Sequence, residues 1–404
     1  MEREGFLRGF LKGYYSSVVL DSVPDIASRE FGFGELGKKI SGRHLAFSSP
    51  KELNSFLRER APFYISYSAA RYEFPVARPM EAKSLVGADL IWEFDADDIQ
   101  TDCKASHDSW KCKSCGASGK GNIEQCTECG MGVSVDEWVC PECISETKKQ
   151  TQKLLGILRN DFGFSGDVPI NFSGSKGFHV HYRGQEIQGL SKKARLELLD
   201  FITGANMDLK ALGFFFEKKK FSCPAYSRSR GWAKKILSNV RAAIDANDSS
   251  LLAVMGATTV RTAKKIIAEK DSVFSAMERG NLLSAPGVKA EKFWQSALSY
   301  AADSEVLGVD RQTSVDINKI IRVPSTIHGS TGLLAMPVIE AELAGFDALS
   351  ESVVLPSHGV KVVNVSAPRF YVGGNWLGPY SSSEEELPAY AAFYLLSRGR
   401  ADLG

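Results

Sequence analysis

The spacing of hydrophobic and polar positions changes several times along the chain, which predicts a mixture of helices and strands. Apolar residues within 6–11 have helical spacing, whereas residues 43–47 and 63–67 are typical of short strands. In TKKQTQKLLGILRNDFG, the leucines and the isoleucine share one face, which predicts a helix ending at Gly163. Strand-like segments resume near Val306, in VVLPSHGVKVVNV and in PRFYVGG. We therefore expect an α+β fold.

Residues 191–304 have a predominantly helical pattern. SKKARLELLDFITG begins with a serine suited to capping and ends at a glycine, and VRTAKKIIAEK and KAEKFWQSALSYAA add further helical stretches. Because the mixed pattern resumes afterwards, we interpret 191–304 as a helical insertion. The core would then comprise residues 1–190 and 305–404, with a Cys-rich insertion at 103–143.

The stretch LIWEFDADDIQ places four acidic residues in an apolar run that is otherwise typical of a buried strand. Side chains alternate along a strand, so Glu93, Asp95 and Asp97 would project to one side and Trp92 and Phe94 to the other. Carboxylates this close repel each other, and a shared Mg²⁺ or Mn²⁺ ion would relieve the repulsion. A solvated strand face would show the same alternation, so the pattern leaves both interpretations open.

VPINFSGSKGFHVHYRG consists of two extended runs joined by a Ser/Gly turn, which predicts a hairpin. The glycines, the Ser173 hydroxyl and the Lys176 ammonium suit a phosphate group. After the turn, His179 and His181 would point to the same side of the strand. An ordinary hairpin with a surface lysine fits the same residues.

A third cluster lies in VDRQTSVDINKIIRVPSTIHGSTGL, which contains Asp310, Asp316, Arg322 and His328. The arginine and histidine beside the HGSTG turn could hold a triphosphate. An exposed helix end followed by a polar turn is the alternative.

The cysteines are concentrated in one segment. Seven of the eight lie between Cys103 and Cys143, and the stretch before them shows no export signal, which favours metal ligation over disulfides. In CKSCGASGKGNIEQCTECGMG, two C-x₂-C pairs are separated by ten residues, which is the pattern of a tetrahedral zinc ribbon. The predicted ligands are Cys112, Cys115, Cys126 and Cys129.

Composition restricts the class of protein. With 44% hydrophobic residues over 404 positions and a net charge of +1, the chain can form more than one globular core, and any nucleic-acid surface must be a local patch. No apolar run is long enough for a membrane span, so we expect a cytoplasmic protein without a membrane partner. One candidate patch, FFFEKKKFSCPAYSRSRGWAKK, interleaves basic residues with Phe221, Tyr226 and Trp232, although a solvated face explains it equally well.

Taken together and in this order, the motifs resemble the archaeo-eukaryotic DNA primase catalytic (small) subunit family in its archaeal form. The resemblance rests on REFGFG, RHLAF, GADLIWEFDAD, FSGSKGFHVH, IIRVPSTIHGSTGL and PRFYVGG. It implies a mixed-sheet primase catalytic core and a nucleotidyltransferase that makes short primers de novo for DNA replication. The substrates would be single-stranded DNA template and nucleoside triphosphates, pyrophosphate would be released, and the partner would be a large primase subunit carrying an iron–sulfur cluster.

The resemblance also implies roles for individual residues. Glu93 and Asp95 align with the family's metal-binding pair, with Glu where Asp is usual, and Asp97 is the alternative partner of Asp95. Asp310 is similar to the third carboxylate, so these residues would hold two Mg²⁺ or Mn²⁺ ions. The nucleotide-binding residues would be Ser173, Lys176, His179, Arg322, His328 and Arg43.

For the remaining cysteines, the resemblance implies the zinc site that archaeal relatives carry beside the active strand. Its ligands would be Cys103, His107, Cys140 and Cys143, so the chain would bind two structural zinc ions, the ribbon lying within the loop of this site. Two other functions remain as alternatives: a repair or translesion primase-polymerase of the same superfamily, and a non-catalytic zinc-ribbon subunit that binds nucleic acid.

Overall fold

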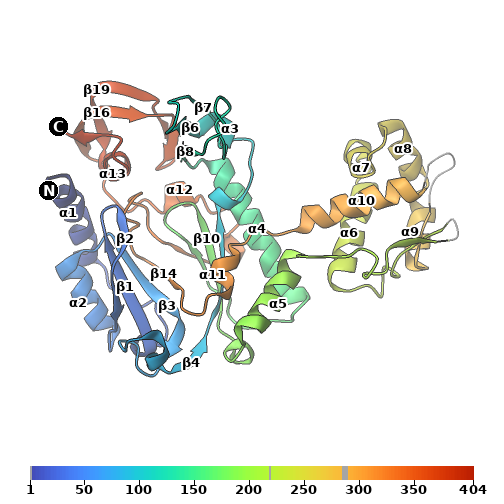
Figure 1. Cartoon of the computed structure of the whole chain (residues 1–404), viewed down its shortest axis with the longest axis horizontal. Helices are drawn as coiled ribbons and strands as arrows, with labels where there is room; N and C mark the ends of the chain where they lie inside the picture. The colour runs from blue at the N-terminus through green and yellow to red at the C-terminus, as the bar shows by residue number, and fades with distance from the viewer. Residues whose placement is uncertain (1, 218–219, 284–289) are drawn as a thin grey trace. The chain divides into compact units, whose positions relative to one another are not determined.

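The structure of the protein is a computed structural model that describes residues 2–217, 220–283 and 290–404. It divides into two compact units (Figure 1). The first comprises Met1–Gln152, Ser165–Arg195 and Gly308–Gly404, and the second comprises Lys153–Phe164 and Leu196–Leu307. Helices and several sheets occur together, which confirms the expected α+β class. The second unit also includes residues 153–164. The hydrophobic pattern predicts one continuous helix there and gives no sign of a boundary between the units within it.

An antiparallel five-stranded sheet forms one part of the first unit, in the order β14-β3-β1-β2, with β4 also paired to β3. The rings of Phe31 and Phe56 both contact Phe47, which joins the sheet to helix α2, and helices α1 and α2 lie side by side next to the sheet (Figure 1). The elements are β1 (Arg29–Glu35), β2 (Lys38–Leu45), β3 (Tyr64–Tyr72), β4 (Leu85–Ala88), β14 (Ile320–Arg322), α1 (Glu2–Ser17) and α2 (Pro50–Arg60).

A second antiparallel sheet, in the order β15-β9-β10-β5, contains the predicted hairpin. Its strands are β5 (Leu90–Asp95), β9 (Ile170–Phe172), β10 (Gly177–Tyr182) and β15 (Pro337–Val338). Phe94 pairs with Phe178 and both are fully buried, whereas Glu93 pairs with His179 on the opposite face. The alternation read from the sequence therefore separates an apolar face from an acidic one.

Smaller sheets complete the first unit. The Cys-rich segment forms β6 (Ser109–Cys112), β7 (Ser118–Lys120) and β8 (Val133–Asp136). Near the C-terminus are β16 (Gly359–Ala367), β17 (Phe370–Val372), β18 (Asn375–Leu377), β19 (Tyr380–Pro388) and β20 (Asp402–Leu403). The remaining helices that begin in this unit are α3 (Lys104–His107), α4 (Pro141–Asn160), α5 (Lys192–Thr203), α11 (Arg311–Val315), α12 (Ala348–Glu351) and α13 (Ala389–Ser397).

The second unit is built mainly of helices around its own hydrophobic core. Its elements are α6 (Gly231–Asp245), α7 (Ser249–Met255), α8 (Val260–Ala268), α9 (Lys270–Glu278), α10 (Ala290–Glu305), β11 (Phe215–Glu217), β12 (Lys220–Ser222) and β13 (Asn281–Leu282). The side chains of Asp248 and Thr259 cap α7 and α8 by accepting backbone N–H bonds. Helices α8 and α10 coincide with the helical stretches VRTAKKIIAEK and KAEKFWQSALSYAA predicted from the sequence.

The strand predicted near Val306 is wrong, and two aromatic residues of the candidate basic patch are not exposed. Val306 belongs to an irregular connection after α10 rather than to a strand, and its side chain is exposed. Phe221 and Trp232 are buried, so these aromatic members of the predicted basic patch are not available to stack on bases. The ammonium group of Lys234 lies over the Tyr226 ring, 3.2 Å from its centroid, and Lys218 and Lys219 are outside the described residues.

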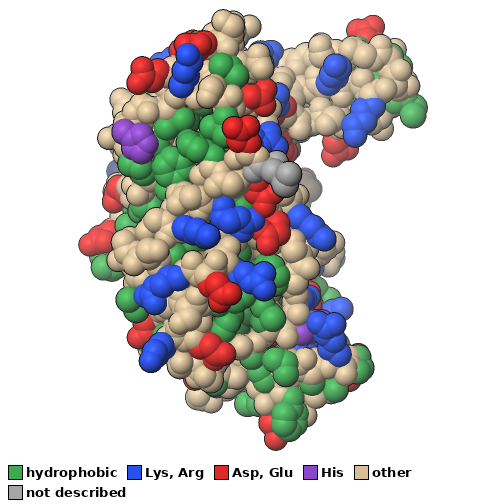
Figure 2. Space-filling model, turned by 90° about the vertical axis from the view of Figure 1, so that its left-hand side faces the viewer, with side chains coloured by type: hydrophobic (Ala, Val, Ile, Leu, Met, Phe, Trp, Pro, Cys, Tyr) green, Lys and Arg blue, Asp and Glu red, His purple; other side chains and the backbone are tan. Residues whose placement is uncertain are grey.

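On the surface in view in Figure 2, Lys and Arg side chains are interspersed with Asp and Glu, with several Lys and Arg side chains across the middle of the face. This agrees with a net charge of +1 and means that any strongly positive surface is local. Within the described part of the chain, every helix is too short or too polar to cross a lipid bilayer.

Candidate active site

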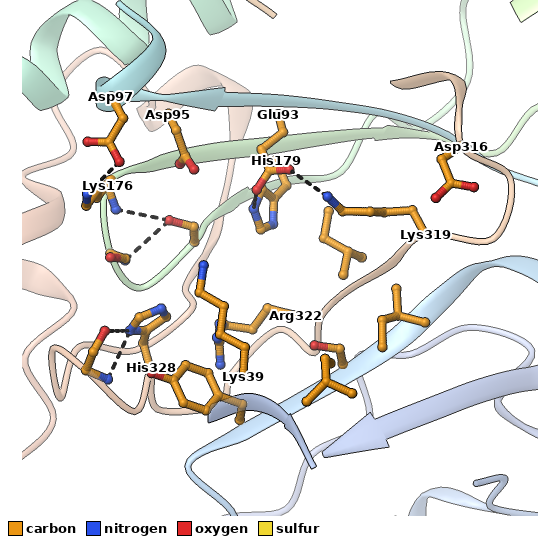
Figure 3. Close-up of a pocket in the computed structure, with 18 of the residues that line it drawn as sticks. Lys39, Glu93, Asp95, Asp97, Lys176, His179, Asp316, Lys319, Arg322 and His328 are labelled. Atoms are coloured by element: carbon orange, nitrogen blue, oxygen red, sulfur yellow. Dashed lines mark hydrogen bonds and ion pairs between the residues drawn. The ribbon is translucent and has the colours of Figure 1, made fainter. Parts of the chain in front are cut away.

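A pocket of about 630 Å³ lies between the acidic face of β5 and β10 and residues of β2, β3 and β14 (Figure 3). It brings together all three sequence clusters. The predicted site residues that line it are Arg43, Glu93, Asp95, Asp97, Ser173, Lys176, His179, Arg322 and His328. Asp310 is the one predicted member that does not line the pocket itself.

The carboxylates of Glu93 and Asp95 have different proton affinities, although both project from β5. Burial would raise the pKa of Glu93, but the His179 imidazole, 3.3 Å away, together with Lys319 and Thr313 lowers it to about 2. Burial and the neighbouring charge of Glu93 instead raise the pKa of Asp95 to about 6. Burial contributes most to this rise, and the repulsion between neighbouring carboxylates, which a divalent cation would relieve, adds to it. The donor set therefore fits Mg²⁺ or Mn²⁺.

Asp310 lies directly behind Glu93. Its backbone N–H donates to the Glu93 carbonyl over 3.1 Å. The Thr313 hydroxyl lies 2.8 Å from a carboxylate oxygen of Glu93 and 2.6 Å from one of Asp310. The other Asp310 oxygen caps α11 by accepting the N–H groups of Gln312 and Thr313. Asp310 is thus joined to Glu93 through one bridging hydroxyl.

Asp97 lies beyond the end of β5 and is engaged by Lys176. The Lys176 ammonium group contacts Asp97 at 2.5 Å and Glu137 at 2.7 Å. Burial lowers the pKa of Lys176, but these two carboxylates outweigh it and raise the pKa above its ordinary value. Asp97 is therefore paired with a lysine, and the charge of Glu93 raises the pKa of Asp95 more than the charge of Asp97 does.

The turn after β9 is organised by the Ser173 hydroxyl. Its oxygen accepts the backbone N–H groups of Ser175, Lys176 and Gly177 over 3.2–3.3 Å. The turn's amides are therefore satisfied by the serine, whose own proton remains free to donate. Gly174 has φ +77°, and a Cβ there would lie 2.9 Å from Cβ of His328, so this position requires glycine. Because residue 174 has no side chain, the Ser/Gly turn after β9 packs directly against the turn that contains His328.

Arg322 and His328 form the cationic and hydrogen-bonding wall opposite the carboxylates. Burial lowers the pKa of Arg322 to about 10, so it stays charged at neutral pH, and its Nη1 atom has no hydrogen-bond partner among the described residues. Its guanidinium lies over the Tyr64 ring, 5.1 Å from the centroid. Burial, reinforced by Arg322, lowers the pKa of His328 well below its usual value. Nδ1 of His328 accepts the Ser330 N–H, so the proton of the neutral ring resides on Nε2. An anionic ligand would supply the hydrogen-bond partner that the buried Nη1 group of Arg322 lacks among the described residues.

Sequence reasoning missed several pocket residues. Lys39, Tyr64, Lys319 and Arg398 all line the pocket. Lys39 lies four residues before Arg43 on β2, an even separation that could have suggested a common side of the strand. Tyr64 and Arg398 gave no such signal.

Of the remaining candidates, Asp316 also lines the pocket. His181 does not: it is buried and stacks on Tyr67 with the rings 3° from parallel. Arg43 reaches the pocket, but its guanidinium is paired with the fully buried Glu30 at 2.7 Å.

Both groups of cysteine and histidine assemble as the sequence and the resemblance predicted. Within each group, the potential ligand atoms all lie within 4.8 Å of one another. The groups are Cys103, His107, Cys140 and Cys143, and Cys112, Cys115, Cys126 and Cys129. Sulfur pairs in the second group are 3.6 Å apart, close to the roughly 3.8 Å expected around a tetrahedral zinc ion. In the first group, Nδ1 of His107 is 2.8 Å from the Asp108 carboxylate, the usual orienting partner of a zinc-bound histidine. Both groups can hold a metal ion and are consistent with zinc.

Comparisons with known proteins agree with this geometry. The sequence model of a family described as DNA primase small subunit matches residues 135–340, about half of the chain. The DNA primase small subunit PriS of Cenarchaeum symbiosum is 29% identical, over 97% of this chain and 96% of the relative. Those of Nitrosopumilus maritimus and Methanosarcina barkeri are 28% and 26% identical, over 98% and 99% of this chain and 96% of each relative. These matches confirm the resemblance seen in the motifs, and the chain belongs to the DNA primase small subunit family.

Proposed function

We propose that the protein is the catalytic subunit of a DNA primase. It would synthesise short primers de novo on single-stranded DNA by nucleotidyl transfer from nucleoside triphosphates, with release of pyrophosphate. The main support for this proposal is the arrangement of the pocket, which is lined by the β5 carboxylates, by an arginine whose buried Nη1 atom has no hydrogen-bond partner among the described residues, and by a neutral histidine. A single small site then offers ligands for both a divalent cation and a triphosphate.

Glu93, Asp95 and Asp310 would hold the catalytic Mg²⁺ or Mn²⁺ ions. When bound, these ions would lower the pKa of the attacking hydroxyl and offset the charge on the leaving pyrophosphate. Glu93, the less basic of the β5 pair, stays ionised throughout the neutral range. Asp310 would join after exchanging its contact with the Thr313 hydroxyl for the cation.

The other residues bind and orient the triphosphate. Arg322 offers a planar fork of donors, His328 offers Nε2–H, and the Ser173 hydroxyl offers a proton. The attacking 3′ oxygen forms a bond to the α-phosphorus while the bond to the bridging oxygen breaks, so pyrophosphate leaves and no protein nucleophile takes part. Arg322, His328 and Ser173 would accelerate the reaction by holding the triphosphate in the orientation that the attack requires.

In this proposal Asp97 has a different role from its neighbours on the strand. Its contact with Lys176 supports Glu93 as the partner of Asp95, as the alignment with the family suggests. Asp97 and Glu137 together would keep Lys176 at the edge of the phosphate-binding turn. The role of Asp97 would be to position this lysine.

Further parts of the proposal concern the rest of the protein. Two zinc ions would each be bound by one of the two Cys/His groups. They would stabilise the fold locally, because ribbons of this size have little hydrophobic core of their own. A large primase subunit would be the partner, and the complex would work in the cytoplasm.

The test is a priming assay on unprimed single-stranded DNA, with ribonucleotides or deoxyribonucleotides and with Mg²⁺ or Mn²⁺. We expect Glu93→Gln to abolish primer synthesis and Asp97→Asn to retain a substantial part of it. Extension of a supplied primer without initiation would favour a repair or translesion polymerase. Absence of both activities in the complex with the large subunit would favour a non-catalytic nucleic-acid-binding subunit.

A further inference from the structure

The three-stranded sheet of the Cys-rich segment has two chemically different faces. Its cross-strand pairs are Ser109 with Lys120 and Asp136, and Lys111 with Ser118 and Ser134. Paired residues project to the same side of a sheet, so these six side chains form one polar surface. We call the surface formed by Ser109, Lys111, Ser118, Lys120, Ser134 and Asp136 the ribbon face.

The opposite side of the same sheet is the small core of the ribbon. Trp110 is buried there with Cys112 and Cys126, and Val133 and Val135 pack against them. That side therefore provides the local stability, and the ribbon face contributes no apolar side chain to it. The polar and basic composition of the ribbon face is therefore not explained by local stability.

The ribbon face lines a hollow of about 960 Å³ whose charge is strongly positive. Lys111, Lys113, Lys120 and Arg400 line it against a single carboxylate, Asp136. Arg400 is paired with Asp136 at 2.5 Å, whereas the three lysines are exposed and form no ion pair with any residue that the structure describes. Three ammonium groups without ion-pair partners among the described residues, beside three serine hydroxyls, offer several donors suited to anions.

The hollow meets the candidate active site along one short stretch of backbone. Asp136 pairs with Arg400, which lines the hollow, and lies 3.6 Å from Arg398, which lines the catalytic pocket. The next residue, Glu137, contacts Lys176 in that pocket. A polyanion lying across the ribbon face would therefore continue directly into the catalytic pocket.

We infer that the ribbon face binds the phosphate backbone of the single-stranded template next to the catalytic pocket. This inference rests on the proposed function for the identity of the strand. Charge complementarity and continuity with the pocket select a nucleic-acid strand, since a free nucleotide would contact only one or two of these groups.

The ribbon face contacts the phosphate backbone of the strand and not its bases. Trp110 is the only aromatic residue in β6, β7 and β8 as described, and it is buried on the other side. Stacking, which gives other single-strand binders much of their affinity, is therefore absent from this surface. Binding should be strongly salt-dependent and nearly independent of sequence.

The experiment measures binding of the full-length, zinc-loaded protein to a labelled single-stranded DNA oligonucleotide of mixed sequence, without nucleotides, by fluorescence anisotropy across a salt series. The variant is Lys111→Ala/Lys113→Ala/Lys120→Ala. We expect affinity to fall about tenfold or more at low salt, and the slope of log K against log salt to flatten by about 2, for three lost contacts. The matched control replaces three exposed lysines elsewhere, Lys12, Lys51 and Lys192, with alanine and should leave the slope nearly unchanged.

Several outcomes overturn the inference. Equal salt slopes for the two triple variants would overturn it. Loss of zinc from the ribbon variant without a change in DNA binding would also overturn it, because the lysines would then only offset the charge of the zinc thiolates. The same titration is repeated with a single-stranded RNA oligonucleotide. If the lysine substitutions weakened binding of RNA but not of DNA, the surface would be assigned to the product strand instead of the template. A wild-type protein that binds with the expected slope but never primes would refute the proposed function and leave the ribbon face as a nucleic-acid surface.

Discussion

Arg322 offers the sharpest test of the site, because the structure predicts opposite effects on stability and on ligand binding. Its guanidinium lies against the Tyr64 ring, and its buried Nη1 atom has no hydrogen-bond partner among the described residues. Burial lowers its pKa from the ordinary value to about 10. At 1.36 kcal/mol per tenfold change, holding this charge in the ligand-free protein costs up to about 3 kcal/mol at neutral pH. A cation with a lowered pKa destabilises the fold at every pH below that pKa, so the cost is present throughout the physiological range.

Replacing Arg322 with methionine removes the charge and keeps an unbranched side chain. The cation–π contact with Tyr64, worth about 0.5–1 kcal/mol, is lost as well. We therefore expect the free energy of unfolding of the ligand-free Arg322→Met protein to rise by up to about 2–2.5 kcal/mol. Nucleoside triphosphate binding should weaken by 10- to 100-fold, because a charge-assisted hydrogen bond contributes about 1.5–3 kcal/mol.

Urea denaturation without ligand and calorimetric titration with a nucleoside triphosphate measure the two effects on the same preparation. Arg58→Met, an exposed arginine of α2, is the matched control and should change neither quantity appreciably. If Arg322→Met destabilised the ligand-free protein, the arginine would be a structural residue with a partner that satisfies it. Unchanged triphosphate affinity would remove it from the binding site.

Three further predictions concern separate parts of the protein. Asp95→Asn should reduce primer synthesis by about 10²–10³-fold or more while circular dichroism and melting temperature remain those of a folded protein, because the buried face of β5 is untouched; near-normal synthesis would refute the metal-ligand assignment. Cys126→Ser should lower the zinc content from about two ions per chain to about one, measured by plasma emission spectroscopy, and two retained ions would contradict the ribbon site. Burial lowers the pKa of His181 well below its usual value, so folding excludes a proton that the unfolded chain binds below about pH 6.5. Stability present above pH 6.5 should then be lost by up to about 1.4 kcal/mol per pH unit on acidification, and His181→Phe should melt with a smaller difference between pH 7.5 and pH 5.5; an unchanged difference would refute this.

Local patterns were sufficient for much of the fold. The alternation around Glu93 predicted the two faces of β5, and the Ser/Gly turn predicted the β9–β10 hairpin, because strand period and turn chemistry act over a few residues. The two C-x₂-C pairs likewise predicted the ribbon ligands from spacing alone. The strand expected near Val306 was wrong because a short apolar run does not distinguish a strand from an irregular connection.

The motifs by themselves indicated which residues of this protein are candidates for the chemistry, and their order indicated the family. Only the tertiary structure decided how those residues divide the work. Asp97 has the same residue type and strand period as Asp95, yet it pairs with Lys176, because β5 ends between them and Glu137 approaches from a segment 39 residues away from that lysine. Lys319 and Tyr64 join the site, and Trp232 leaves the predicted basic patch, because contacts between distant segments decide which side chains are buried and which face a pocket. A sequence pattern records the period of one segment, but it does not record which other segment will pack against it.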